Sequence, residues 1–411
     1  KIKIKNIFNP KFSLVMDERM EPPDTQVNIF IKKLNDILIH IQNARLAYHV
    51  LYACYEVSWI DNELPSGPAD TRAPSHNVFD HNYATASMSN WLIEKGEPRG
   101  ILLYIDLGGP QRFISNSRKL RDLWASSYFA SALAWSLFWP FIKTFGPDVM
   151  ILPTCRENPF YYHSLISELW QNNVKEVIDD IKNLIRRVTE GEYDPNEDAI
   201  PRYAIVPVTA TFMLPDINVL KRFEDFKDVN DLEDLKRKVK ERYERVWKKI
   251  YDEVIKACKK LSFGKLGEKA SELLESCKNY GFNKTPPLPL RVITIHTDEL
   301  YNLGFLRSKK EQYKLYHYMF KLLAYKEGKE KIYKFRPEEE LELFKLTEDL
   351  ASESLKSWPE EKSNRGFEYC SLCGSLPAII VMPRRIEEFE SKGLTREIEP
   401  IFSEGERICP Y

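Results

Sequence analysis

Glycine is scarce in this chain, with 16 residues among 411, and this excludes collagen-like and glycine-repeat architectures. Cysteine is scarce as well. Seven unevenly spread cysteines cannot form a disulfide scaffold, so a close cysteine pair indicates a metal site in a reducing compartment. The chain also lacks an excess of one charge, because 60 basic and 61 acidic side chains leave a formal net charge of −1. A nucleic-acid partner would therefore have to bind a local basic surface.

Long apolar runs and signal-peptide patterns are missing too. The longest apolar stretch, near 130–141, is interrupted by Ser131, Ser136 and Pro140 and is too short to cross a bilayer. We therefore expect a cytoplasmic protein with no membrane partner. Only five glutamines accompany the many Lys, Arg and Glu residues, a composition that favours a thermophilic host.

The apolar content of 43% is enough for two or three folded domains. Periodicity and turn residues predict the following elements: a loose start over 1–25, helices within 27–59 and 79–91, a strand at 101–107, a helix at 117–143, strands at 149–152, 204–214 and 291–296, and a charged helical region at 309–356. Strand, helix, strand, strand and helix in this order are the skeleton of a ferredoxin-like α+β unit.

A charged stretch over 216–277 interrupts this skeleton. Basic and acidic residues alternate there among sparse Val, Leu and Ile residues. This mixture predicts a solvated antiparallel helical insertion, whereas a nucleic-acid surface would carry mostly one sign.

The C-terminal region contains a zinc-binding pattern. Cys370 and Cys373 are separated by two residues and followed by Gly374, a spacing that lets both sulfurs reach one Zn²⁺. Cys409 starts what looks like a second knuckle, and we expect the fourth ligand from residues absent from this chain or from elsewhere in it. The alternatives are buried cysteines or a redox pair, but no thioredoxin-like strand and helix flank Cys370. The zinc would be structural.

A second candidate site lies where two aspartates and two histidines, both metal-binding residue types, fall within twelve positions: Asp70, His76, Asp80 and His81. They could bind a divalent metal that activates water against a phosphodiester. Alternatively, Asp80 is a helix N-terminal charge and Asp70 anchors a turn. The residues alone leave both interpretations open.

A third candidate is the turn after the 101–107 strand. Gly108 and Gly109 could present backbone N–H groups to a phosphate, with Arg118 and Lys119 beside them. The segment matches neither a Walker motif nor Gly-x-Gly-x-x-Gly. The alternative is a tight connection whose following helix packs Trp124, Tyr128 and Leu133 inward.

Several of these segments together resemble the large signature subunit of type III-B CRISPR (Cmr) effector complexes. They are Ile105–Ile114, Ser117–Trp124 with Ser127 and Tyr128, Phe145–Pro153 with the loop from Arg156 to Pro159, Leu64–Arg72, Phe79–His81 and the Cys370 knuckle. The resemblance runs in order from about residue 64 to the C-terminus.

The resemblance implies an α+β chain of three domains: a partial HD-like helical domain at 1–98, a ferredoxin-like degenerate palm domain at 99–305 with the charged insertion at about 216–280, and a helical domain with an incomplete zinc ribbon at 306–411. It implies CRISPR RNA, target RNA and other Cmr subunits as partners. The family's activities, switched on by target RNA, are cleavage of single-stranded DNA and synthesis of cyclic oligoadenylate from ATP. Implied cofactors are structural Zn²⁺ and a divalent metal (Mg²⁺, Mn²⁺ or Ni²⁺) at the HD or palm site.

Two departures from the family pattern matter. The chain contains no His-Asp dipeptide, and Gly108-Gly109 continues into Pro110 instead of forming Gly-Gly-Asp-Asp. The chain alone could therefore position substrates but lacks the paired carboxylates for nucleotidyl transfer. From the family we carry over Asp80 and His81 with Asp70 and His76 as catalytic candidates, and Gly108, Gly109, Arg118 and Lys119 as nucleotide-binding candidates. The alternatives are a non-catalytic scaffold for guide RNA and sister subunits, and a stand-alone metal-dependent phosphohydrolase.

Overall fold

The computed structural model describes residues 2–5, 13–16, 24–62, 64, 67, 69, 76–91, 98–115, 117, 119–188, 201, 203–260, 265–302, 315–326, 380–381 and 407–408. The chain forms two compact units. The first consists of 1–89, 145–149 and 154–202, and the second of 90–144, 150–153 and 203–411. Helices are combined with small antiparallel sheets, which confirms the predicted α+β class. Within the described residues, no helix is long and apolar enough to cross a membrane.

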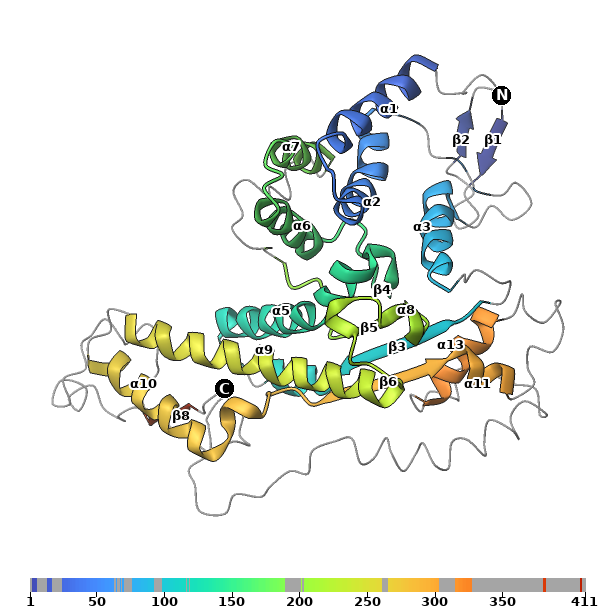
Figure 1. The fold of residues 1–411 in the computed structure, drawn as a ribbon. Coiled ribbons are helices and arrows are strands. Elements are labelled where there is room, and N and C mark those ends of the chain that lie inside the picture. Colours follow the sequence, from blue (N-terminus) through green and yellow to red (C-terminus); the bar gives the residue numbers. More distant parts are fainter. Residues whose placement is uncertain are drawn as a thin grey trace. The chain divides into compact units, whose positions relative to one another are not determined.

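The first unit is mainly helical (Figure 1). Its elements are α1 (Asp24–Leu38), α2 (Ala44–Asp61), α3 (Val78–Ser89), the 3-10 turn η1 (Pro147–Val149), α6 (Pro159–Gln171) and α7 (Ile178–Val188). Helix α2 is central, because α1, α6 and α7 all pack against it. It begins where the Asn43 side chain accepts a hydrogen bond from the Leu46 N–H at 3.1 Å, which satisfies one of the free amides of its first turn. His49 on α2 is buried, and its Nδ1 lies 3.1 Å from the Tyr161 hydroxyl.

The start of the chain differs from the predicted loose segment. Strands β1 (Ile2–Lys5) and β2 (Ser13–Met16) pair antiparallel, with Ile2 opposite Met16. The physical reason is visible in the sequence, because Lys and Ile alternate with the period of a strand.

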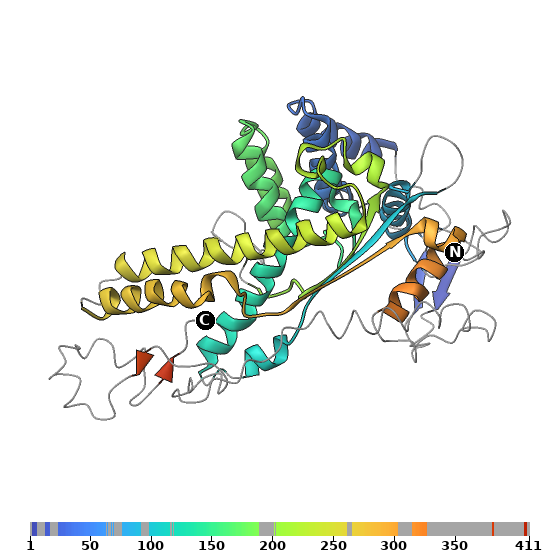
Figure 2. The ribbon, with the colours of Figure 1, turned by 60° about the horizontal axis from the view of Figure 1, so that its bottom comes forward.

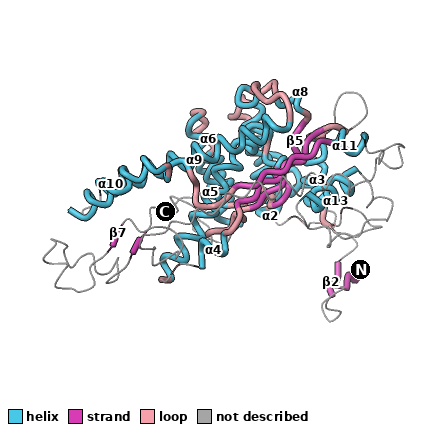
Figure 3. Tube along the Cα trace, turned by 90° about the horizontal axis from the view of Figure 1, so that it is seen from below, coloured by secondary structure: helices cyan, strands magenta, loops and turns pink. Residues whose placement is uncertain are grey.

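The second unit is built on a four-stranded antiparallel sheet, shown in magenta in Figure 3. Its strands are β3 (Gly100–Leu107), β4 (Met150–Leu152), β5 (Thr209–Pro215) and β6 (Leu290–His296), in the spatial order β4-β5-β3-β6. All three strand pairs are antiparallel. In chain order, α5 (Leu120–Phe145) lies between β3 and β4, and α9 (Leu232–Lys260) between β5 and β6. This order of helices and strands is the predicted ferredoxin-like arrangement.

Both faces of the sheet are covered. On one face Phe212 of β5, which pairs with Leu103 of β3, contacts Phe138 and Phe141 of α5. On the other face Leu102 and its partner Met213 join a core with α11 (Thr297–Asn302) and α13 (Leu315–Lys326). The central strand β3 is therefore buried on both sides, which explains its nearly continuous apolar sequence.

The charged insertion is a helical hairpin, as predicted. Helix α10 (Lys265–Cys277) runs back along α9 (Figure 2), and Trp247, Tyr251, Ile255 and Leu274 form the core between them. Short elements complete the insertion: α8 (Ile217–Leu220), η2 (Glu224–Phe226), η3 (Lys278–Tyr280) and η4 (Phe282–Lys284). Helix α9 also contacts α5, because the Arg242 guanidinium donates to the Ser136 carbonyl and Trp247 meets Phe129 edge-on.

The predicted domain boundaries at 98/99 and 305/306 stay predictions. The structure adds that residues 154–202 belong to the first unit, because α6 and α7 pack on α2. The remaining described elements are the six-residue helix α4 (Pro110–Ser115) and a pairing of β7 (Ile380–Val381) with β8 (Arg407–Ile408).

Candidate functional site

The predicted His/Asp site lies in the first unit, where one arginine binds two carboxylates. Both oxygens of Glu56, on α2, accept hydrogen bonds from Nε and Nη2 of Arg156, and Oδ1 of Asp80 accepts one from Nη1. The guanidinium also lies over the Tyr83 ring, 5.0 Å from its centroid. Glu56 is only 6% exposed, so a bidentate arginine is the partner that its buried charge requires.

The second oxygen of Asp80 is also occupied. Asp80 lies in the first turn of α3, where its Oδ2 accepts from the Asn77 N–H at 3.0 Å and the Asn77 Oδ1 accepts from the Asp80 N–H at 2.8 Å. The hydrogen bond from Arg156 is the main cause that lowers the pKa of the Asp80 carboxyl below its ordinary value, and the Asn77 N–H lowers it further. Asp80 therefore caps a helix and pairs with an arginine, which matches the structural alternative for this residue.

The two histidines of the site lie together on the surface. The Nε2 of His76 is 3.4 Å from the Nδ1 of His81, and the two rings are stacked with an interplanar angle of 19°. Two nitrogens bound to one tetrahedral metal at about 2.1 Å would be separated by about 3.4 Å, so this pair has a suitable spacing. Asp70 lies outside the described residues. Among the residues described, no group of three or more potential ligands converges. As it stands, this arrangement does not fit a divalent metal, because both oxygens of Asp80 bind protein donors.

The predicted glycine turn joins β3 to α4. The Gly108 N–H donates to the Pro289 carbonyl at 2.8 Å, so it does not point toward a ligand. Gly109 is exposed, with a φ of +70° in the left-handed region that favours glycine, and its carbonyl accepts from the Phe113 N–H. Arg118 is outside the described residues. The carbonyl of Lys119 accepts from the N–H groups of Asp122 and Leu123, at the start of α5.

The alternative interpretation of this turn predicts that the following helix packs Trp124, Tyr128 and Leu133 inward. Leu133 is buried, but Trp124 is 51% exposed and stacks on Tyr128 with an interplanar angle of 19°. Trp124 therefore does not pack inward. It lies in the first turns of α5, where Leu120 and Leu123 are exposed as well.

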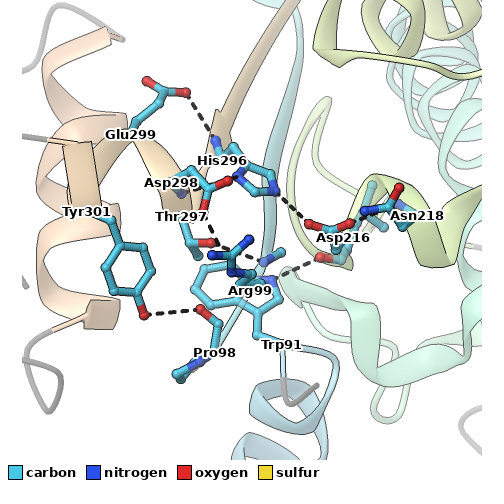
Figure 4. Close-up of polar contacts among 12 residues, drawn as sticks. Trp91, Pro98, Arg99, Asp216, Asn218, His296, Thr297, Asp298, Glu299 and Tyr301 are labelled. Atoms are coloured by element: carbon cyan, nitrogen blue, oxygen red, sulfur yellow. Dashed lines mark hydrogen bonds and ion pairs between the residues drawn. The ribbon is translucent and has the colours of Figure 1, made fainter. Parts of the chain in front are cut away.

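A histidine network that the sequence analysis missed lies at one end of the sheet (Figure 4). The Nε2 of His296 lies 3.0 Å from Oδ2 of Asp216, and the His296 Nδ1 accepts from the Asp298 N–H at 3.1 Å. Glu299 accepts from the His296 N–H at 3.0 Å and binds Lys326 at 2.9 Å. The sequence contained a signal for this contact, because Asp216 lies just after a predicted strand and His296 ends another. Both strands, β5 and β6, pair with the start of β3, which brings the two residues to the same end of the sheet.

The chemical capacity of this network follows from its hydrogen bonds. Nδ1 accepts a hydrogen bond from a backbone N–H. In the neutral imidazole the hydrogen is therefore on Nε2, which donates a hydrogen bond to Asp216. Both ring nitrogens thus have partners within the protein. His296 and Asp216 connect β5 and β6 and are not arranged as a general base with a free nitrogen.

The cysteines predicted to bind zinc, Cys370, Cys373 and Cys409, lie outside the described residues. The short pair of strands near them is described. Ile380, which follows Cys373 in the sequence, pairs with Ile408, the residue directly before Cys409.

Comparisons with known proteins agree with one another. The family model described as CRISPR-associated protein Cmr2, N-terminal, matches residues 102–252. The CRISPR system CMR subunit Cmr2 of Saccharolobus solfataricus is 38% identical over 388 residues, which are 89% of this chain and 35% of that protein. The Cmr2 subunit of Pyrococcus furiosus is 38% identical over 106 residues, which are 26% of this chain and 11% of that protein.

Solved structures give the same result. A chain of the type III-B Cmr-beta complex in its apo state matches with a TM-score of 0.76 and 34% identity, covering 100% of this chain and 40% of that one. A chain of Cmr-beta bound to cognate target RNA matches with a TM-score of 0.73 and 35% identity, covering 41% of that chain. The chain thus spans 35% of the length of the Saccharolobus relative. It belongs to the Cmr2 family of type III-B CRISPR systems and corresponds to the N-terminal portion of that family.

Proposed function

We propose that this chain is part of the large subunit of an RNA-guided type III-B antiviral effector complex in the cytoplasm. Its partners would be other Cmr subunits, CRISPR RNA and target RNA. One observation carries the proposal: this whole chain superposes on a chain of a Cmr-beta complex bound to cognate target RNA, at a TM-score of 0.73 and 35% identity. Agreement in both fold and sequence over the full length favours a shared role in assembly.

We further propose that the full-length subunit links target-RNA binding to cleavage of single-stranded DNA and to synthesis of cyclic oligoadenylate from ATP. In this proposal the ferredoxin-like sheet is a degenerate palm. Its glycine turn, with Gly108 and Gly109 followed by Arg118 and Lys119, would line the nucleotide side. The carboxylates for nucleotidyl transfer would come from a second palm, because this chain has no Gly-Gly-Asp-Asp.

Two metals belong to the proposal. A structural Zn²⁺ would be held by Cys370, Cys373 and Cys409, and the pairing of Ile380 with Ile408 supports it because it joins the segments that flank these cysteines. A divalent metal (Mg²⁺, Mn²⁺ or Ni²⁺) would serve the palm or the HD-like site. At the HD-like site the metal would have to displace Arg156 from Asp80 before Asp80, His76 and His81 could bind the metal together. The palm site is therefore favoured.

The test uses the full-length subunit in its assembled complex. Incubation with CRISPR RNA, matching target RNA, ATP and Mg²⁺ or Mn²⁺ should yield cyclic oligoadenylate, and a non-matching RNA should yield none. If the complex assembles and binds target RNA but makes no cyclic product, the enzymatic part of the proposal is wrong.

The second candidate function is a non-catalytic scaffold that holds guide RNA and sister subunits. One observation favours it: the groups predicted to act in chemistry are used to stabilise the fold. Asp80 binds Arg156 and Asn77, and the Gly108 N–H binds Pro289. A complex that retains its RNA and all subunits but is inactive under the conditions above would support the scaffold.

A further inference from the structure

The helical hairpin reaches the glycine turn between β3 and α4 through one face of α9. Tyr243 and Trp247 lie four residues apart on α9, so both side chains project from the same face of the helix. They are 3% and 4% exposed. Each side chain begins a chain of contacts that ends at the glycine turn, one at Gly108 and the other at Gly109.

The first chain of contacts consists of hydrogen bonds. The Tyr243 hydroxyl donates to the Leu288 carbonyl at 2.7 Å. The next residue, Pro289, accepts a hydrogen bond from the Gly108 N–H at 2.8 Å through its own carbonyl. Leu288 is 1% exposed, so its carbonyl lies away from water and requires a partner within the protein. Tyr243 therefore fixes the segment to which Gly108 is bonded.

The second chain of contacts consists of aromatic rings. The N–H of Phe113, on α4, donates to the Gly109 carbonyl at 3.1 Å. The Phe113 ring lies 5.8 Å from the ring of Phe129, on α5, and Phe129 meets Trp247 edge-on at 6.2 Å between centroids. Aromatic pairs attract each other at these separations. Trp247 therefore supports α4, and through α4 it supports the carbonyl side of the turn.

Helix α9 is itself anchored to α5 beside these contacts. Pro140 lies inside α5 and has no N–H, so the Ser136 carbonyl, four residues earlier, lacks its usual helical donor. The guanidinium of Arg242, the residue before Tyr243, donates to this carbonyl at 3.3 Å. Displacing α9 would therefore take this donor from α5 and would also disturb both chains of contacts.

The turn that these contacts hold has one free backbone donor. Gly109 is exposed with a φ of +70°, and within the part of the chain that the structure describes its N–H has no hydrogen-bond partner. An exposed backbone N–H can bind a phosphate oxygen. Its direction is set by the groups that hold the turn, and a donor fixed in advance binds an anion at a lower entropic cost.

We propose that Tyr243 and Trp247 are positioning residues, which hold the glycine turn in the conformation that exposes the Gly109 N–H. This rests on the proposed function, which assigns the turn to the nucleotide side of the palm. It deepens that function because it makes nucleotide binding depend on the helical hairpin, a segment far from the turn in the sequence.

The first experiment compares two tyrosines of α9 in the full-length subunit within its assembled complex. Tyr243→Phe removes only the hydroxyl that binds Leu288. Tyr251→Phe is the matched control, because Tyr251 is also 3% exposed and its hydroxyl donates to the Leu274 carbonyl of α10 at 3.1 Å. Urea unfolding compares the stabilities, and hydrogen exchange measured by mass spectrometry follows the segment from Leu107 to Phe113. Initial rates give the KM for ATP and the kcat of cyclic oligoadenylate synthesis.

We expect Tyr243→Phe to speed exchange of this segment about two- to tenfold, the range that corresponds to one lost hydrogen bond. The KM for ATP should rise by a similar factor while kcat changes little, since the turn would bind the nucleotide and the carboxylates for the chemistry would come from elsewhere. Tyr251→Phe should lose similar stability but leave both the exchange and the KM as in wild type.

A second pair of variants tests the aromatic contacts. Phe129→Leu removes the ring between Phe113 and Trp247 and should likewise speed exchange of the turn. Phe138→Leu is its control on the same helix, because the Phe138 ring packs on Phe212 of the sheet, with 5.6 Å between the centroids. This control should destabilise the protein without loosening the turn.

Exchange of the turn at the wild-type rate in Tyr243→Phe and Phe129→Leu would overturn the proposal. Equal acceleration by the two tyrosine variants would overturn it too, because the effect would then follow a general loss of stability. Faster exchange with an unchanged KM would support the positioning role and refute the turn as a nucleotide site, which is a failure of the proposed function. The exchange experiment needs no activity, so it decides the positioning role even if the complex makes no cyclic product.

Discussion

At the scale of single residues, Gly100 shows how closely the second unit is packed. A Cβ at this position would lie 2.2 Å from Cδ1 of Trp91 and 2.6 Å from the Leu214 carbonyl oxygen. Trp91 is completely buried, and its Nε1 donates to that same carbonyl at 2.9 Å. The absence of a side chain at position 100 therefore allows the Trp91 indole to pack against the end of the sheet and to reach the Leu214 carbonyl.

We expect Gly100→Ala to destabilise the protein by about 1–3 kcal/mol, the usual cost of overpacking a core. Urea unfolding followed by tryptophan fluorescence measures this. Gly67→Ala is the control, because a Cβ there would meet no atom within 4 Å. Equal effects of the two substitutions would contradict the packing argument.

Arg156 binds both carboxylates at the predicted His/Asp site, Glu56 and Asp80. Arg156→Gln would leave Glu56 buried without its cation, and we expect a loss of roughly 2–3 kcal/mol at pH 7. The Arg156 pair holds the pKa of Asp80 below its ordinary value, so it stabilises the folded state above about pH 4 and loses this effect as the pH falls through the lowered pKa. Urea unfolding at pH 7 and at pH 3.5 should show the difference between wild type and variant shrinking at the lower pH.

The double variant Glu56→Gln with Arg156→Gln is the control for Arg156. It removes both charges and should recover part of the stability. A difference in stability between wild type and Arg156→Gln that does not change with pH would argue against the ion pair with Asp80 as part of its cause.

The sequence identified Asp80, His76 and His81 as neighbours because they are close along the chain. It could not identify Arg156 as the partner of Asp80, since the two lie 76 positions apart and meet only after α6 has packed on α2. The same limit applies to His296 and Asp216, which are separated by 80 positions.

At the scale of elements, periodicity was a reliable guide where one face is apolar. The strand predicted at 101–107 is Gly100–Leu107, and the helix predicted at 117–143 is Leu120–Phe145. The strand predicted from 204 begins only at Thr209, since propensity does not show which residues have a partner strand. Helices α6 and α7 were not predicted, although Arg186 and Arg187 in the last turn of α7 are a typical C-terminal signal.

The α9 helix supplies the prediction at this scale. Trp247 is 4% exposed and its Nε1 donates to the Phe282 carbonyl at 2.8 Å, so Trp247→Ala should cost about 3–5 kcal/mol. Val254→Ala on the same helix, at a site 47% exposed, should change the stability by less than about 0.5 kcal/mol. Thermal melts followed by circular dichroism compare the two. A small effect at Trp247 would mean that the hairpin core does not stabilise the insertion.

At the scale of the whole molecule, the order of elements predicted the ferredoxin-like sheet, because the connections of four antiparallel strands leave few topologies. The division into units was harder to predict. Residues 154–202 follow β4 in the sequence, yet they pack with helices from the beginning of the chain. No change in composition marks the point at which the chain passes from the second unit back to the first.

Metal analysis tests the C-terminal module of the whole subunit. We expect about one zinc per full-length subunit, lost when Cys370 and Cys373 are changed to Ser, because a structural site needs all its thiolates. Cys258→Ser should keep the metal, since this free cysteine lies in α9. A stable wild-type protein without zinc would refute the site.

The central strand of the sheet also has a consequence for how the protein is made. Both neighbours of β3 come much later in the sequence: Ile101 pairs with Leu214 on one side and with His296 on the other. During translation this apolar strand leaves the ribosome long before either hydrogen-bonding partner exists. High contact order slows folding, and an unpaired apolar strand edge promotes aggregation, so we expect the nascent chain to be prone to aggregation until residue 296 has emerged.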